Sequence, residues 1–396
     1  MNAQKKNLKG LSLKELQEFV ESLGEKKYRA AQIFSWMYSR GVKSFDEMTD
    51  ISREFREVLA SSARLDALEL SRTSVSPTDG TTKLLFRLDD GLLIESVLIP
   101  PVDADPPEDE DESTESTAAD KRLTLCVSTQ VGCPLDCKFC ATGTMGFLRN
   151  LTAGEIVDQV LQAQRIADRR ITNLVYMGMG EPMLNYEAVM KSVELVTDDH
   201  ALNIGARRIT ISTAGYADKI RQLADEDKKV KLALSLHSLD TEQRTRLMPI
   251  TKKFSVEELI VALEYYYRKT RRRPTLEYIP FDGFNDTAAD VKKFVKLSKR
   301  VPCKVNIIPF HSISFTGISG FGATLKPTPR DQIEKFAQSL REANITVMVR
   351  SSSGEDIEAA CGQLAVEEGK TRLRPSAATM PAGKTGNPVG NNSAEP

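Results

Sequence analysis

The sequence predicts an α/β fold in which six strand–helix units form part of a TIM-like barrel, preceded by a smaller helical region. From about residue 122 to 350, short apolar runs with strand character alternate with amphipathic helical patterns. The six runs are LTLCVST, NLVYMGM, RRITIST, VKLALSL, TLEYIP and CKVNIIP. A complete barrel has eight such units, so six of them predict a partial (β/α)6 barrel.

Residues 1–75 are predicted to form a small helical accessory domain. Ser12, followed three residues later by Glu15, is typical of a helix N-terminus, and an apolar face comes after it. A second helix fits KKYRAAQIFSWMY. Next, the turn signals Asp79-Gly80 and Asp90-Gly91 flank KLLFRL and precede LLIESVLIP, which predicts a small hairpin.

A strongly acidic segment follows the hairpin. Residues 101–120 carry nine Asp and Glu and no Lys or Arg, so we expect a disordered insert and assign 76–121 to hairpin plus insert. The whole chain has a net charge of −1, and this segment alone carries −9, so the other residues together carry +8. This excess of basic residues is consistent with an anionic partner such as RNA. It is equally consistent with basic residues spread over solvent-exposed faces.

Residues 122–368 are assigned to the barrel and a C-terminal extension. Thr152 before Glu155 and Ser255 before Glu258 predict two helix starts within it. The strands are followed by VGCPLDCKFCATG, GMGEPM, STAG, SLHSL and PFHS, so polar and reactive residues are expected at the carboxyl ends of the strands. The Gly-, Pro- and Asn-rich tail, 369–396, is expected to be disordered.

The first ten residues lack the apolar run of a secretory signal, and no window approaches the length of a membrane span. Six cysteines in 396 residues, three of them clustered, indicate a metal or catalytic arrangement in a reducing compartment. We therefore expect a soluble cytoplasmic protein with no membrane partner.

Three cysteines, Cys133, Cys137 and Cys140, lie within eight positions, and the chain's three histidines are all distant from them. Thiolates bind iron–sulfur clusters or zinc, and structural zinc needs four ligands. A [4Fe-4S] cluster on three cysteines leaves one iron open to a small molecule. The alternative is a zinc knuckle that a distant ligand completes.

The CxxxCxxC spacing after a first strand resembles the radical S-adenosylmethionine (SAM) superfamily, in which SAM chelates the open iron through its amino and carboxylate groups. GMGEP resembles that superfamily's second motif, which implies that Gly180 and Glu181 accept hydrogen bonds from the SAM ammonium. The resemblance also implies SAM contacts at the strand ends, by Ser212, Ser235, Leu236, His237 and His311. Taken alone, each of these is an ordinary satisfied polar or apolar residue at a strand terminus.

The sequence resembles the RlmN family of RNA adenine C2-methyltransferases over about residues 10–368. Three motifs carry this resemblance: TLCVSTQVGCPLDCKFCATG, ITNLVYMGMGEP and EDIEAACGQLA. The resemblance implies a radical SAM barrel, one [4Fe-4S] cluster and two molecules of SAM per turnover. It implies methylation of an adenosine of 23S rRNA at the peptidyl transferase centre, and of the adenosine 3′ to the anticodon in tRNA. An electron donor such as flavodoxin is then required.

The family's chemistry assigns roles to three more residues. Carbon 2 of adenine is electron-poor and does not attack the methyl group of SAM, so a radical route is needed. The resemblance implies that Cys361 first carries the methyl group and then links to RNA. Glu95 removes the ring proton, and Cys126 releases the product by forming a disulfide with Cys361. Cys303 matches no functional position and is expected in the core.

Two features depart from the resemblance or leave it open. The acidic insert lies between Glu95 and Cys126, and His311 stands where many relatives carry Asn.

Three basic clusters could contact RNA phosphates or could simply be solvated: KTRRRP (269–274), KKFVKLSKR (292–300) and Arg207-Arg208. The N-terminal helices offer a surface for an RNA stem. The adenosine has to be unstacked for carbon 2 to be reached. The rival functions are methylation of carbon 8 by a sister activity and a non-enzymatic, metal-containing RNA-binding protein.

Overall fold

The computed structural model describes residues 5–101 and 122–366. The predicted acidic insert, apart from its first residue, and the predicted tail lie outside the described residues. Within them, one sheet of ten strands runs through the protein, in the order β14-β13-β12-β11-β10-β9-β6-β5-β4-β3.

Seven neighbouring strands of this sheet are parallel, and their order in space follows their order in the sequence. This is what consecutive right-handed strand–helix units produce. The strands are β6 (Thr124–Cys126), β9 (Asn173–Tyr176), β10 (Ile209–Thr213), β11 (Lys231–Ser235), β12 (Thr275–Tyr278), β13 (Lys304–Ile307) and β14 (Thr346–Val349). The six predicted runs coincide with β6 to β13, which confirms the α/β partial barrel.

The seventh parallel strand, β14, was not predicted. It lies at the edge of the sheet, with Val347 buried and Thr346 exposed. Its run TVMV is apolar at three of four positions, but four residues are too few to distinguish a strand from a helix segment by periodicity.

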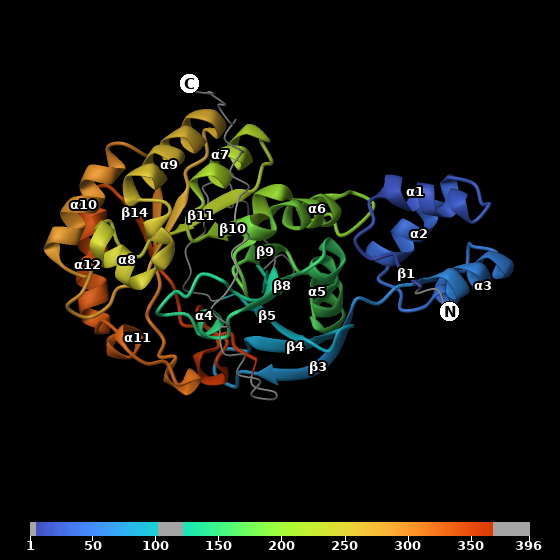
Figure 1. Cartoon of the computed structure of the whole chain (residues 1–396), viewed down its shortest axis with the longest axis horizontal. Helices are drawn as coiled ribbons and strands as arrows, with labels where there is room; N and C mark the ends of the chain where they lie inside the picture. The colour runs from blue at the N-terminus through green and yellow to red at the C-terminus, as the bar shows by residue number, and fades with distance from the viewer. Residues whose placement is uncertain (1–4, 102–121, 367–396) are drawn as a thin grey trace, which may run out of the picture.

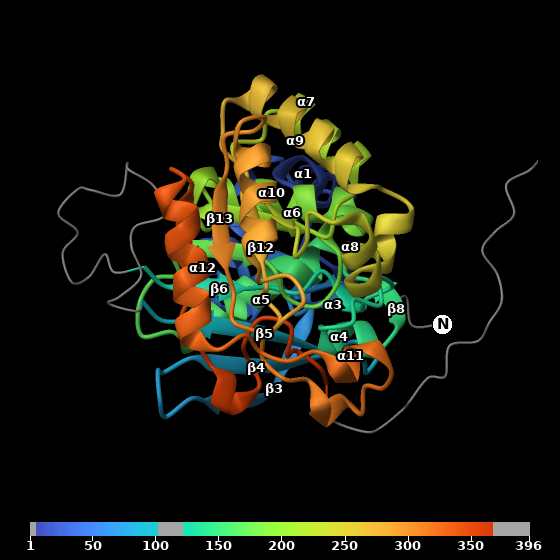
Figure 2. The ribbon, with the colours of Figure 1, turned by 90° about the vertical axis from the view of Figure 1, so that its left-hand side faces the viewer.

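Helices cover the outer face of the parallel strands. Figure 2 looks onto α10 and α12, which lie in front of β12 and β13. The long helices of this layer are α5 (Ala153–Ile166), α6 (Tyr186–Thr197), α7 (Ala217–Asp225), α8 (Thr241–Leu247), α9 (Val256–Thr270), α10 (Ala288–Ser298) and α12 (Arg330–Glu342). The predicted capping boxes at Thr152 and Ser255 are confirmed at the starts of α5 and α9. The shorter helices are α4 (Ala141–Thr144), α11 (Phe321–Thr324) and the 3-10 turns η1 (Phe45–Glu47), η4 (Pro182–Asn185), η5 (Ala206–Arg208), η6 (Pro249–Lys252), η7 (Ser314–Thr316) and η8 (Glu355–Ile357).

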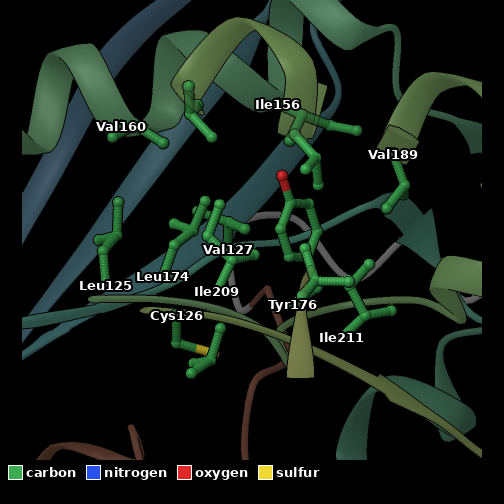
Figure 3. Close-up of a cluster of buried hydrophobic side chains, with 14 of the residues drawn as sticks. Leu125, Cys126, Val127, Ile156, Val160, Leu174, Tyr176, Val189, Ile209 and Ile211 are labelled. Carbon is green, nitrogen blue, oxygen red and sulfur yellow. The ribbon is translucent and has the colours of Figure 1, made fainter. Parts of the chain in front are cut away.

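Side chains of β6 alternate between the helix layer and the barrel interior, as expected for a strand. Figure 3 shows Leu125 and Val127 on the side of the sheet where Ile156, Val160 and Val189 of the helices pack, and Cys126 on the opposite side. The same alternation that buries the core therefore turns the Cys126 thiol toward the interior of the barrel.

Three antiparallel strands continue the sheet beyond β6: β3 (Leu68–Val75), β4 (Thr82–Leu88) and β5 (Leu93–Ile99). The predicted hairpin is confirmed as β4 and β5. The prediction of helix up to residue 75 is wrong for 68–75, which form β3. Thr73 and Val75 are β-branched, and pairing with β4 satisfies the backbone of a strand whose side chains are mostly exposed.

The N-terminal helices α1 (Leu13–Ser22), α2 (Tyr28–Tyr38) and α3 (Arg53–Ser62) lie at one end of the long axis of the molecule (Figure 1). The capping box of Ser12 and Glu15 is confirmed at α1. The short parallel strands β1 (Lys6–Asn7) and β2 (Ala63–Arg64) close this region, and a hairpin of β7 (Gln130–Gly132) and β8 (Phe147–Asn150) lies beside the barrel.

A buried ion pair joins the N-terminal segment to the barrel. Lys9 Nζ lies 2.8 Å from Asp158 Oδ1 on α5, and the two side chains are 1% and 0% exposed. Asp158 Oδ2 also accepts the backbone N–H groups of Ala67 and Leu68, at 3.1 and 3.0 Å. One carboxylate thus connects the first residues, the start of β3 and a barrel helix.

No helix in residues 5–101 and 122–366 is long and apolar enough to span a bilayer.

Asp158→Ala leaves a buried ammonium and two backbone N–H groups without their acceptor. We expect the free energy of unfolding to fall by about 3–5 kcal/mol, as for other broken buried pairs. Urea titration followed by circular dichroism measures the loss. Lys191→Ala is the control, because its pair with Glu15 (2.7 Å) is partly exposed and is expected to contribute less than about 1 kcal/mol. Equal losses in the two variants would contradict this account.

Candidate active site

The cysteine loop, residues 133–146, follows β6 and lies between β7 and β8. Gly132 at its start has φ +73°, and a Cβ there would lie 1.8 Å from the carbonyl oxygen of Gly146. Cys133 N donates to that same oxygen at 2.8 Å. Only glycine permits this closure, which fixes both ends of the loop.

The three thiols of the loop influence one another. Burial raises the pKa of Cys133 to about 12, and the nearby Cys140 raises it further. Burial also holds the pKa of Cys137 well above its usual value, with Cys140 and Cys133 adding to the effect. Cys140 N donates to Cys137 O at 3.1 Å. Three thiols held this way ionise only beside a compensating positive charge, which a bound metal centre provides.

The donor set fits an iron–sulfur cluster better than a single metal ion. Among the described residues, no group of three His, Cys, Asp or Glu side chains is arranged to hold one metal ion. The thiolates of a cluster each bind a different iron, so they need not converge on one point. This disfavours the zinc knuckle. Cys133, Cys137 and Cys140 are the residues that would hold a [4Fe-4S] cluster.

Glu181, at the carboxyl end of β9, connects neighbouring strand ends. Its backbone N–H donates to Gln130 Oε1 at 2.8 Å, while its carboxylate accepts the N–H of Ala214 after β10 at 2.7 Å. Burial raises its pKa to about 7, against the effect of these hydrogen bonds. Gly180 has φ +102°, and a Cβ there would lie 2.5 Å from Gln130 Cβ, so this turn also requires glycine. The SAM contacts of Gly180 and Glu181 stay a prediction.

Two of the predicted SAM contacts, Ser212 and Ser235, share one buried carboxylate. Ser212 Oγ donates to Glu277 Oε2 at 2.6 Å, and Ser235 Oγ donates to the same atom at 3.1 Å. Glu277 lies on β12 and is buried. The sequence analysis did not single it out, although a charged residue inside the apolar run TLEYIP is a usable signal.

Leu236 and His237 reach the site mainly through their backbone. Both N–H groups donate to the carbonyl of Glu277, at 3.0 and 3.2 Å. His237 has φ +53°, and its Nδ1 accepts the N–H of Ile279 at 3.1 Å. Burial lowers the pKa of His237 to about 3, and Arg244 lowers it further, so the ring is neutral. The ring packs edge-on against Phe139 of the cysteine loop, with the centroids 4.6 Å apart.

Arg244 on α8 is fully buried and was missed by the sequence analysis. Its guanidinium donates to the carbonyl oxygens of Ala214, Ser235 and Leu236, at 2.6, 3.0 and 3.0 Å. Burial lowers its pKa to about 10, and the nearby Cys137 acts in the opposite direction. The stretch TEQRTRL has the composition of a solvated helix face, so the sequence contains no signal for this role.

A hollow lies between β5 and β6 on one side and the carboxyl ends of β13 and β14 on the other. We call it the site hollow; its lining includes Cys126, Met177, His311, Arg350 and Cys361. His311 is buried, and its Nδ1 lies 3.1 Å from Glu355 Oε1 without hydrogen-bond geometry.

The site hollow brings Cys126 and Cys361 together from distant parts of the sequence. Burial, together with the nearby Cys361, raises the pKa of Cys126 to about 12, while Arg350 opposes the rise. Burial also raises the pKa of Cys361, and Arg350, whose Nη1 donates to Cys361 Sγ at 3.5 Å, opposes that rise. Both thiols are free. Cys303, in contrast, is buried just before β13, as expected of a core residue.

The segment that carries Cys361 is held against the cysteine loop. The carbonyl of Gly362 accepts the N–H of Ala141 at 2.7 Å, and the carbonyl of Leu364 accepts Thr142 Oγ1 at 2.7 Å. Cys361 therefore lies beside the helix that follows Cys140.

Glu95 on β5 is buried, not exposed to solvent as most strand carboxylates are. Lys83 Nζ lies 3.6 Å from its Oε1. Burial raises the pKa of Glu95 to about 7, although Lys83 opposes the rise. Its carbonyl accepts Ser128 Oγ at 2.6 Å, just after β6, and Val97 on the same strand pairs with Cys126. The three predicted catalytic residues thus occupy adjoining strands and the segment that covers them.

Parts of the basic clusters lie away from the site. Arg207-Arg208 precede β10, 271–274 precede β12 and Arg300 precedes β13, which places these residues at the amino ends of parallel strands, opposite the site. Arg300 pairs with Glu257 and Glu264, at 2.7 and 2.6 Å, which favours an ion-paired surface residue at this position. Lys293, by contrast, lies on α10 and pairs with Asp240 at the start of α8, at 3.4 Å.

Comparison with known proteins agrees with this geometry. Residues 127–297 match the radical SAM superfamily, and residues 6–65 match the ribosomal RNA large subunit methyltransferase N-terminal domain. The crystal structure of a radical SAM methyltransferase from Sphaerobacter thermophilus superposes with a TM-score of 0.80 and 41% identity, covering 91% of this chain and 99% of that chain. The fold and the cysteine loop therefore define a radical SAM methyltransferase.

Curated relatives narrow the family. A protein of Thermotoga sp. strain RQ2, named probable dual-specificity RNA methyltransferase RlmN, is 44% identical over 366 residues, which are 92% of this chain and 99% of that protein. A relative of the same name from Salinibacter ruber is 41% identical, over 91% of this chain and 94% of its own. The chain belongs to the RlmN family of radical SAM enzymes. The predicted family and enzyme class are confirmed, and the non-enzymatic alternative is set aside.

Protein purified without oxygen is expected to contain about four iron and four sulfide per chain, as a [4Fe-4S] centre requires. Cys133→Ala removes one thiolate and is expected to lose most of both, together with the charge-transfer absorption. Cys303→Ala, a buried cysteine outside the loop, serves as the control and should keep the full content. Iron and sulfide analysis, together with an absorption spectrum, measures the cluster content of each variant. Stoichiometric zinc in the wild type would contradict the prediction of a [4Fe-4S] cluster.

Proposed function

We propose that this enzyme methylates carbon 2 of adenosine in RNA. Its substrates are the adenosine of 23S rRNA at the peptidyl transferase centre and the adenosine 3′ to the anticodon in tRNA, both reached in the cytoplasm. The observation that carries the proposal is the site hollow, where two free thiols, Cys126 and Cys361, lie together beside the cysteine loop. Methylation by direct displacement needs neither thiol, whereas a route through a methylated cysteine uses both.

Cys361 receives the methyl group in the first half of the reaction. Its thiolate forms the new S–C bond as the sulfonium C–S bond of SAM breaks, and S-adenosylhomocysteine leaves. The pKa of Cys361 is raised by burial, so the hydrogen bond from Arg350 at 3.5 Å supports the charged form that attacks. Residues at the strand ends are proposed to hold SAM: Gly180, Glu181, Ser212, Ser235, Leu236, His237 and His311.

A [4Fe-4S] cluster held by Cys133, Cys137 and Cys140, together with a second SAM, would supply the one-electron chemistry that turns the methyl group on Cys361 into a carbon radical. The chain's residues do the rest. Cys361 holds the resulting methylene against adenine, which becomes covalently joined to the protein. Glu95 accepts the proton of carbon 2, and its burial keeps bulk water from that proton.

Cys126 completes the reaction. Radical addition leaves one unpaired electron on the adduct, and that electron would return to a bound cluster as the proton of carbon 2 leaves, which gives a closed-shell thioether. The thiolate of Cys126 then bonds to the sulfur of Cys361 as the C–S bond to the methylene carbon breaks. The electron pair of that bond stays on the methylene carbon, which takes up a proton to become the methyl group, and the methylated adenosine leaves. The disulfide that remains has to be reduced before the next turnover. An external electron donor such as flavodoxin is therefore proposed for the cluster, and a thiol or equivalent reductant for the disulfide.

Cys126→Ala keeps the methyl-accepting thiol but removes the releasing one. In the presence of SAM, reductant and RNA, it is expected to accumulate a covalent protein–RNA adduct at Cys361, while the wild type releases methyladenosine. Denaturing gels and peptide mass spectrometry detect the adduct, and chromatography against 2-methyl and 8-methyl standards identifies the product. Cys303→Ala is the matched control and should turn over normally. No methyl group on wild-type Cys361 would overturn the proposal, and an 8-methyl product would reassign it to the sister activity.

Glu95 is expected to act only as the carboxylate. Since burial raises its pKa to about 7, the rate of product release should increase as the pH rises through about 7 and level off above it. Glu95→Gln removes the base and should slow release by at least about 100-fold, the lower range for general bases, with no such pH limb. Single-turnover assays from pH 6 to 9 measure both. Glu69→Gln, an exposed carboxylate on β3, is the control. A wild-type profile without this limb would exclude Glu95 as the base.

A further inference from the structure

Lys83 has no part in the function proposed above, yet it lies inside the site region. It belongs to β4, and its side chain is only 11% exposed. Its Nζ lies 3.6 Å from Glu95 Oε1 and donates to the carbonyl of Glu358 at 3.3 Å. Glu358 is three residues before Cys361. One ammonium therefore contacts both the predicted base and the segment that carries the methyl-accepting cysteine.

The two oxygens of Glu95 have different surroundings. Oε1 faces Lys83, whereas Oε2 is buried without a hydrogen-bond partner. A general base needs this arrangement, in which one oxygen is oriented and the other is open to a proton. The charged groups that act on Glu95 from the strands beside it are Lys83 on β4 and, more weakly, Arg72 on β3; the backbone N–H of Ala365 acts in the same direction. All three favour the carboxylate, and burial opposes it.

The turn between β3 and β4 holds the same C-terminal segment at other points. The Gly354 N–H donates to Asp79 Oδ2 at 2.8 Å, and Ser76 Oγ donates to Asp356 Oδ2 at 3.0 Å. These bonds fix the segment as far as Asp356, and Glu358 follows with φ +53°. Of these three contacts with the C-terminal segment, the contact of Lys83 with Glu358 lies nearest to Cys361 in the sequence. Lys83 is also the residue among them that contacts the predicted base, Glu95.

We propose that Lys83 is a positioning residue that aims the open oxygen of Glu95 at carbon 2 and holds the base in register with the Cys361 segment. This inference rests on the function proposed above. In the proton step, the C–H bond at carbon 2 of the protein-linked adenine breaks, and its electron pair stays with the ring. The proton forms an O–H bond with Glu95 Oε2, while Lys83 keeps its own protons.

Lys83→Met removes the charge at nearly constant length, and Lys83→Gln keeps a donor for the Glu358 carbonyl. Losing a cation at this distance is expected to raise the pKa of Glu95 by about 1–3 units. Single-turnover release at pH 7 should therefore fall by about fivefold to several hundredfold and increase as the pH rises toward 9, with the protein–RNA adduct accumulating at pH 7. Methylation of Cys361 by SAM, which precedes the proton step, should stay within about twofold of the wild type.

Lys83→Arg is expected to restore most of the rate, and Arg72→Gln, which removes an exposed charge on β3, should change release by less than about twofold. The inference is overturned if Lys83→Met and Lys83→Gln release product at the wild-type rate with an unshifted pH profile. It is also overturned if either variant loses rate equally at every pH, because that result indicates a structural role. If Lys83→Met does not fold, Lys83→Gln decides. A wild type that neither methylates Cys361 nor forms methyladenosine would instead show the failure of the proposed function.

Discussion

Two hydrogen bonds hold the C-terminal segment against the cysteine loop, and the arrangement of the site depends on them. Ala141 N donates to Gly362 O, and Thr142 Oγ1 donates to Leu364 O, each at 2.7 Å. The parallel strands alone leave a gap between β14 and the antiparallel strands. Because these bonds lay the segment across that gap, Cys361 lines the same hollow as Cys126, with Cys126 buried and Cys361 partly buried. A radical route requires shielding from bulk water.

Burial sets the electrostatics of this enclosed region, and a few cations oppose it. Burial raises the pKa of Glu95 and Glu181 to about 7 and raises that of the thiols. Arg350 and Lys83 each contact one of these groups and favour its charged form. Burial therefore keeps the thiols mostly protonated and brings the pKa of the two acids near neutral pH, where each can give or take a proton.

Local patterns in the sequence predicted those helix starts and strands that are determined by neighbouring residues in the chain. The capping boxes at Ser12, Thr152 and Ser255 and the six buried strands were all found because short-range hydrogen bonds and continuous apolar runs leave a direct signal. β3 was misassigned because an outer strand is defined by its partner and can carry polar side chains. β14 was missed although its run TVMV is mostly apolar, because it is only four residues long. Arg244 was missed because a buried arginine in a polar helical stretch has no local signature, whereas Glu277 had the signal of a charge inside an apolar run.

The sequence by itself determined the order of most strands and helices and the three-cysteine loop, because spacing and periodicity are local properties, and its motifs carried the resemblance to the family. Only the tertiary structure decided that Cys126 and Cys361 share one hollow, that Glu95 is buried beside Lys83, and that Arg207, Arg208 and Arg300 lie at the amino ends of the parallel strands. Such relations depend on which distant segments pack together. Burial and charge at a site are properties of that packing.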